Sequence, residues 1–105
     1  GRNMANTFKN YVSASVGTSA VTVYTVPSST TSVVIGLNIA NRSASQITAD
    51  VQLGSTYIIK AVPIPVASSL SVLDGKIIME TTETLRVTSS ASSSADVILS
   101  VLEQS

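Results

Sequence analysis

Residues 32–53, SVVIGLNIANRSASQITADVQL, decide the fold class. Two apolar segments, 32–40 and 46–53, flank the polar residues NRSAS. In both segments apolar residues recur at every second position, the period of a strand with one buried face. The predicted core-facing residues are Val33, Ile35, Leu37 and Ile39 in the first segment and Ile47, Ala49, Val51 and Leu53 in the second. We expect these two strands to form a hairpin, with NRSAS as its loop.

The same period of two continues along the chain, between turn-forming residues. Asp74-Gly75 suits the positive φ angles of a tight hairpin turn, and the PIP sequence at 63–65 argues against a central strand because proline cannot donate to the ladder. No segment has the 3.6-residue apolar period of a helix. We therefore predict an all-β chain, a single-domain antiparallel β-sandwich of about eight strands, with jelly-roll and Ig-like arrangements both open. The further predicted strands are 20–26, 55–62, 67–73, 76–82, 83–89 and 95–103.

The length of 105 residues suits one domain. We expect residues 1–3 to be an expression remnant ahead of Met4, 4–17 to be an N-terminal arm or first strand, and 18–105 to form the sandwich. No apolar run approaches the roughly 18 residues of a membrane span, and no basic-then-apolar leader is visible. The sequence therefore predicts neither membrane insertion nor export.

The formal net charge is zero, and only 11% of the residues are charged. Basic residues are scattered, which argues against nucleic acid as a partner because phosphate binding needs clustered Lys and Arg. Ser and Thr make up 31 of the 105 residues. A surface of hydroxyls opposes close packing only weakly, which suits an assembly; the high Thr content of a sheet surface is an equally good explanation.

The composition argues against catalysis. The chain has no Cys and no His, which removes thiolate metal sites, the usual general base and the commonest transition-metal ligand. The carboxylates form neither a calcium loop nor an obvious catalytic pair. We therefore predict no enzyme activity, no cofactor and no metal site.

The residues Asn41-Arg42-Ser43 match a glycosylation sequon, but Asn and Ser are also common turn formers. Without an export signal we favour the turn. Arg42 is then either solvated or paired with a carboxylate of a partner subunit.

The last predicted strand, ADVILSVLE, carries apolar residues on both faces. Such a strand is either covered on both sides or part of an interface. The adjacent pairs Ile58-Ile59 and Ile77-Ile78 repeat the two-sided pattern. We predict an interface and assign to it Phe8, Tyr11, Arg42, Ile98 and Leu102.

Nearly the whole chain from Met4 resembles small virion structural proteins of tailed bacteriophages, particularly T4-like phages of marine cyanobacteria. The resemblance rests on the VYTVP strand, the strand ending in NRS, the PIP break, the Gly-Lys pair and the ETTETLRV segment. It implies a structural component of the virion that assembles with other virion proteins and with itself, a trimer being favoured. It leaves open whether the component belongs to the neck, tail, fibre or capsid decoration. The alternative function is a receptor- or carbohydrate-binding module at a tail or fibre tip, using loops 41–45 and 89–95.

Overall fold

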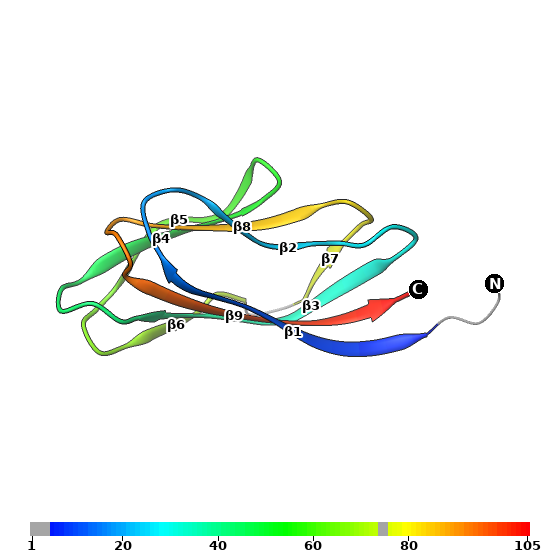
Figure 1. The fold of residues 1–105 in the computed structure, drawn as a ribbon, viewed down its shortest axis with the longest axis horizontal. Coiled ribbons are helices and arrows are strands. Elements are labelled where there is room, and N and C mark those ends of the chain that lie inside the picture. The colour runs from blue at the N-terminus through cyan, green and yellow to red at the C-terminus, as the bar shows by residue number, and fades with distance from the viewer. Residues whose placement is uncertain (1–4, 74–75) are drawn as a thin grey trace.

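The computed structural model describes residues 5–73 and 76–105, which form nine strands in two antiparallel sheets (Figure 1). The predicted β-sandwich is confirmed, and every predicted strand is found within a few residues of its expected position. The strands are β1 (Asn6–Val16), β2 (Val21–Thr25), β3 (Thr31–Asn41), β4 (Ile47–Leu53), β5 (Thr56–Ile64), β6 (Ser69–Ser71), β7 (Ile77–Met79), β8 (Thr84–Ser89) and β9 (Ala95–Gln104).

The order of the strands is that of a jelly roll. Sheet A has the order β1-β9-β3-β6, with β7 also paired to β3, and sheet B has the order β2-β8-β4-β5. The chain changes sheet at each step except between β4 and β5 and between β6 and β7. Counting β6 and β7 as two pieces of one interrupted strand gives the eight strands and two four-stranded sheets of this fold. Of the two arrangements that the sequence left open, the topology selects the jelly roll.

The predicted hairpin between 32–40 and 46–53 is wrong. β3 lies in sheet A, where it pairs with β9, and β4 lies in sheet B, where it pairs with β5 and β8. Residues 42–46 thus cross from one layer to the other, and residues 90–94 cross back between β8 and β9. In the part of the chain that the structure describes, only β4 and β5 are both consecutive and paired, across the turn at Gly54, whose φ is 60°.

A second hairpin, expected between 67–73 and 76–82, is also not formed. β6 pairs with Asn38–Ala40 of β3 and β7 pairs with Ser32–Val34 of the same strand, so both lie along one edge of β3. The expected turn residues, Asp74 and Gly75, lie outside the described residues, as does the expected start at Met4.

A bulge in β3 changes the face of its first residues. The register with β9 shifts between Val34 and Gly36, which places one extra residue, Ile35, between two inward-facing positions. Val34 is therefore fully buried and Ile35 is 43% exposed, the reverse of the prediction. Beyond the bulge the predicted faces are correct, since Leu37 and Ile39 are buried.

The core lies between the two sheets and is aliphatic. Its largest fully buried side chains are Ile39, Ile47, Ile64, Met79, Leu85 and Leu99. Tyr24 joins this core because a second irregularity, between Thr22 and Tyr24, turns it inward next to the buried Val23. The irregular backbone of both bulges thus decides which residues fill the core.

Gly17 lies where two backbone segments approach closely. A Cβ atom there would lie 3.2 Å from the Ser93 nitrogen and 3.3 Å from the Ser92 Cα, and the Gly17 carbonyl accepts a hydrogen bond from Ser89. Gly36, which the sequence suggested as a close-approach position, would place a Cβ atom no nearer than 3.9 Å to Ser100. Of these two glycines, Gly17 therefore has the packing reason to lack a side chain.

We predict that Gly17→Ala lowers the free energy of unfolding by about 1–3 kcal/mol, because two backbone segments must move apart. Gly36→Ala is the matched control and should change it by less than about 0.5 kcal/mol. Urea denaturation of both variants measures the difference. Equal free energies of unfolding for the two variants would show that the backbone at residues 92 and 93 moves aside without loss of stability.

Candidate functional site

The outer face of sheet A carries aligned apolar rows. In the observed register Phe8 of β1 lies opposite Leu102 of β9, which lies opposite Val33 of β3, which in turn lies opposite Ile78 of β7. One apolar row thus crosses four strands. A second, shorter row pairs Val12 with Ile98.

Both rows contain exposed side chains. Among the described residues seven large apolar side chains are exposed, and five belong to the outer face of sheet A: Phe8, Val12, Ile35, Ile78 and Ile98. Phe8 is 73% exposed and Ile78 is 63% exposed. A solvated face of an antiparallel sheet is normally polar. The exposed apolar residues on the outer face of sheet A depart from this pattern and make it the candidate functional surface.

Small residues lie between the two rows. Asn10, Ser100 and Gly36 are register partners, and they leave a shallow depression of about 230 Å³ bordered by Phe8 and Ile35. Within the strand registers of this face the charged residue is Asp96, at one end opposite Ala40. The centre of the face is thus apolar with a small polar floor.

The structure gathers three of the five predicted interface residues on this face, namely Phe8, Ile98 and Leu102. Tyr11 does not share it, because it projects from the other side of β1 into the sandwich, where its ring lies 4.3 Å from that of Tyr24. Arg42 forms an ion pair with Asp96 of the same chain, with Nη1 3.3 Å from Oδ1. The same Nη1 donates a hydrogen bond to Ser15 Oγ at 2.6 Å. Arg42 thus forms an intramolecular ion pair, and its pairing with a partner's carboxylate stays a prediction.

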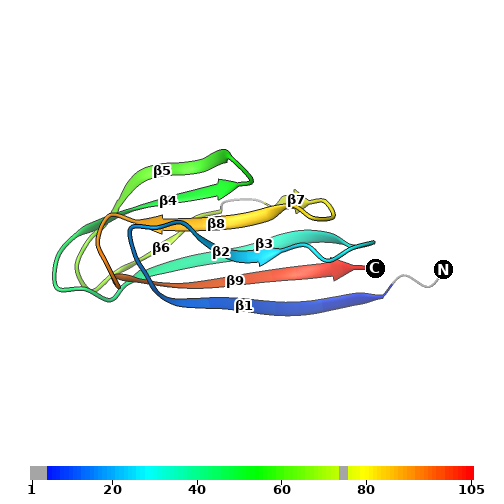
Figure 2. The same ribbon diagram turned by 45° about the horizontal axis from the view of Figure 1, so that its top comes forward.

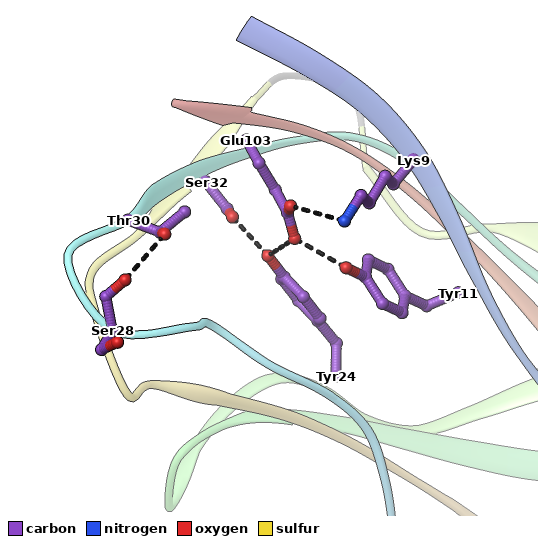
Figure 3. Close-up of polar contacts among 7 residues, drawn as sticks. All are labelled: Lys9, Tyr11, Tyr24, Ser28, Thr30, Ser32 and Glu103. Atoms are coloured by element: carbon purple, nitrogen blue, oxygen red, sulfur yellow. Dashed lines mark hydrogen bonds and ion pairs between the residues drawn. The ribbon is translucent and has the colours of Figure 1, made fainter. Parts of the chain in front are cut away.

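A buried polar cluster lies beneath the apolar row (Figure 3). Glu103 of β9 is 7% exposed, and its Oε2 accepts hydrogen bonds from the Tyr11 hydroxyl at 2.7 Å and the Tyr24 hydroxyl at 2.6 Å. Lys9 Nζ lies 3.4 Å from Oε1. Because the Tyr24 proton is directed to Glu103, the Ser32 hydroxyl donates to the Tyr24 oxygen. Tyr24 belongs to sheet B and the other residues to sheet A, so the cluster links the sheets.

The hydrogen bonds keep Glu103 ionised. Burial alone would raise its pKa, but donation by Tyr11, Tyr24 and Lys9 outweighs burial and holds the pKa below its ordinary value. Burial and the adjacent carboxylate raise the pKa of Tyr11 to about 12 and also raise that of Tyr24. Both phenols therefore remain protonated donors. With its carboxylate engaged by three donors from two neighbouring strands, the cluster is suited to holding strands together.

Asn41, the first residue of the NRS signature, has a structural role. Its Nδ2 donates to the carbonyls of Ser45, Ile64 and Pro65, and its Oδ1 accepts from the backbone and side chain of Ser43. The side chain thus fixes the crossing between the sheets to the end of β5. These contacts agree with the prediction that Asn41-Arg42-Ser43 forms a turn, and they include tertiary as well as local hydrogen bonds.

The described residues offer little else that points to chemistry. Residues 5–73 and 76–105 contain no group of three or more His, Cys, Asp or Glu side chains able to hold a metal ion. In the same residues no helix is long and apolar enough to cross a membrane. The sequence matches no protein-family description and no curated protein.

Sequence reasoning missed the Glu103 cluster and the breadth of the apolar face. Glu103 follows Val97, Leu99 and Val101 at the same period of two, so the sequence was sufficient to predict that its side chain points inward. Its hydrogen-bond partners Tyr11 and Tyr24 could not be predicted, because they depend on which strands are neighbours. Val33 and Ile35 were missed because the bulge reverses their faces.

Acid should destabilise the protein through Glu103. Because its folded pKa lies below the ordinary value of 4.5, its contribution to stability is present above about pH 4.5 and is lost as pH falls through the folded pKa. We predict that Glu103→Gln lowers the melting temperature at pH 7 and flattens its decline below pH 4.5. Melting curves of both proteins from pH 7 to pH 3 measure this, and parallel curves would contradict it.

Removal of one phenol should weaken the cluster. Tyr24→Phe leaves Glu103 with one donor fewer and Ser32 without its acceptor, both in buried positions, and should cost about 1–3 kcal/mol of unfolding free energy. Tyr57→Phe is the matched control, since Tyr57 is 46% exposed, and should change stability by less than about 0.5 kcal/mol. Chemical denaturation compares them. Similar losses for both variants would refute the role of the Tyr24 hydroxyl.

Proposed function

We propose that this chain is a non-enzymatic structural protein of a tailed-phage virion, which assembles through the outer face of sheet A. The observation that carries the proposal is the apolar row of Phe8, Leu102, Val33 and Ile78, which faces outward across four strands and is most exposed at its two ends. A protein that remained a free monomer would gain nothing from these side chains in water, whereas burial against a neighbour releases about 25 cal/mol per Å² of apolar surface.

The phage assignment draws its support from the sequence resemblance and from compatibility of the fold. Jelly rolls occur in viral capsid proteins and also in lectins and cupins, so the fold permits a virion role without selecting it. The scarcity of charge on the outer face of sheet A suits a permanent contact.

The alternative, a receptor- or carbohydrate-binding module, has weaker support. Its expected loops are 41–45 and 89–95, and several of their polar side chains are engaged within the chain. Asn41 and Ser43 bond to each other and to neighbouring carbonyls, and the hydroxyls of Ser89 and Ser94 bond to each other. Groups engaged in this way are poorly placed to recognise a ligand.

We expect the chain to be present in purified particles of the phage that encodes it, as detected by mass spectrometry. A phage carrying Ile78→Glu should incorporate about tenfold less of the chain, because burial of the apolar row against a neighbour would then also bury a charge. Val66→Glu is the matched control, since Val66 is 49% exposed but lies outside that face, and should be incorporated normally. Particles without the chain would overturn the virion assignment, and equal incorporation of both variants would overturn the assignment of the surface.

A further inference from the structure

The sheet edges differ in how they are protected against pairing. β5, at one edge of sheet B, contains Lys60 and Pro63, has a positive φ at Ala61 and pairs irregularly with β4. β2, at the other edge, has five residues, and β6 and β7 have three each. Bulges, charges, prolines and shortness are the usual means of blocking an edge.

Apart from a bulge between Ser13 and Val16, with a positive φ at Ser15, β1 has almost none of these features. It has 11 residues, contains Lys9 as its single charge and contains neither proline nor glycine. Its register with β9 is regular from Asn6 to Ser13. Among the described residues β1 pairs on one side only, and Figure 2 shows it as the outermost strand of sheet A. A long, regular and nearly uncharged edge is suited to adding another strand.

Alternate residues of β1 direct their backbone groups away from β9. Ala5 and Ser105 exchange both backbone hydrogen bonds, so they are a hydrogen-bonded pair. Because the pattern alternates, odd-numbered residues direct their backbone groups to β9. Even-numbered residues, Phe8, Asn10 and Val12 among them, direct N–H and C=O away from β9. The residues on the apolar outer face therefore also carry the outward-directed backbone groups.

We propose that β1 pairs with β1 of a second copy of this chain, antiparallel about a twofold axis at Asn10. This inference rests on the proposed function, because it names the partner for self-assembly. In this register Asn10 faces Asn10, and Phe8 of each copy faces Val12 of the other. About six backbone hydrogen bonds form between the even-numbered residues of the two strands. The two A sheets become one continuous sheet.

The side chains favour this register and a second copy. Phe8 opposite Val12 is an aromatic–β-branched pair, a favourable cross-strand combination. Lys9 lies opposite Tyr11 of the other copy. If the twofold axis lay one residue nearer the N-terminus, Lys9 of one copy would face Lys9 of the other, an unfavourable pair of like charges. If it lay one residue nearer the C-terminus, Phe8 would face Ala14, which lies beyond the regular part of the strand. Antiparallel pairing of one edge with itself closes with two copies, so this contact forms a dimer rather than the trimer expected from the sequence.

Proline substitution tests the contact while preserving the ladder to β9. Asn10→Pro removes an N–H that points away from β9, so the backbone hydrogen bonds between β1 and β9 are kept. Asn10→Thr is the matched control, since both variants lose the bond from the Ser100 hydroxyl to the Asn10 side chain. Sedimentation of the purified chain should show a dimer for wild type and Asn10→Thr, and a dissociation constant raised about tenfold or more for Asn10→Pro. A wild-type monomer, or equal constants for the two variants, would overturn the proposal.

Cysteine substitution tests the register, because the chain has no Cys. Under mild oxidation Asn10→Cys should give a disulfide-linked dimer, since facing Cα atoms in a hydrogen-bonded pair lie about 5.5 Å apart. Phe8→Cys should not, since the two substituted positions would be separated by roughly 13 Å along the strands. Equal cross-linking at both positions would overturn the register. Incorporation into particles tests the proposed function separately, and would persist if only the β1 contact were wrong.

Discussion

The contact between Glu103 and its three donors holds the end of the sandwich that carries the apolar row. β9 is a central strand of sheet A, and its inward residues are apolar until Glu103. A buried carboxylate without partners would be strongly unfavourable, so Tyr11, Tyr24 and Lys9 must be held in place around it. Satisfaction of this charge therefore positions β1 against β9 and ties β2 of sheet B to both.

The consequence for β1 follows from its alternation. Lys9 and Tyr11 point inward and anchor the strand on Glu103, which fixes Phe8, Asn10 and Val12 outward. An edge strand paired on one side would otherwise fray easily. Anchored in this way, it is already extended before a partner arrives, and association then costs less conformational entropy. The polar cluster inside the sandwich and the apolar residues outside thus depend on the same alternation of side chains along β1.

The sequence predicted the strands well and their neighbours poorly, for a physical reason. Period-two alternation records which face of a strand is buried, and β3 and β4 would show the same alternation as a hairpin or as an arch between sheets. The choice depends on tertiary contacts such as those of Asn41, which bonds to Ile64 and Pro65 far along the chain. The face of Ile35 was unpredictable for a related reason, since an inserted bulge residue leaves no signature in the apolar pattern. At the candidate site, the outward direction of Ile98 and Leu102 was predictable because inward and outward side chains alternate along the whole of β9.

The apolar face and the free edge share β1, and this makes the two proposed contacts cooperative. Each copy alone presents a row that ends at Phe8 on the edge of the sheet. Joining two β1 strands places Phe8 beside Val12 of the second copy and continues the apolar surface across the junction. A larger apolar surface excludes more water when a partner protein covers it, so strand pairing would strengthen attachment to that partner. Edge pairing and face burial would then occur in sequence, the first building the surface that the second uses.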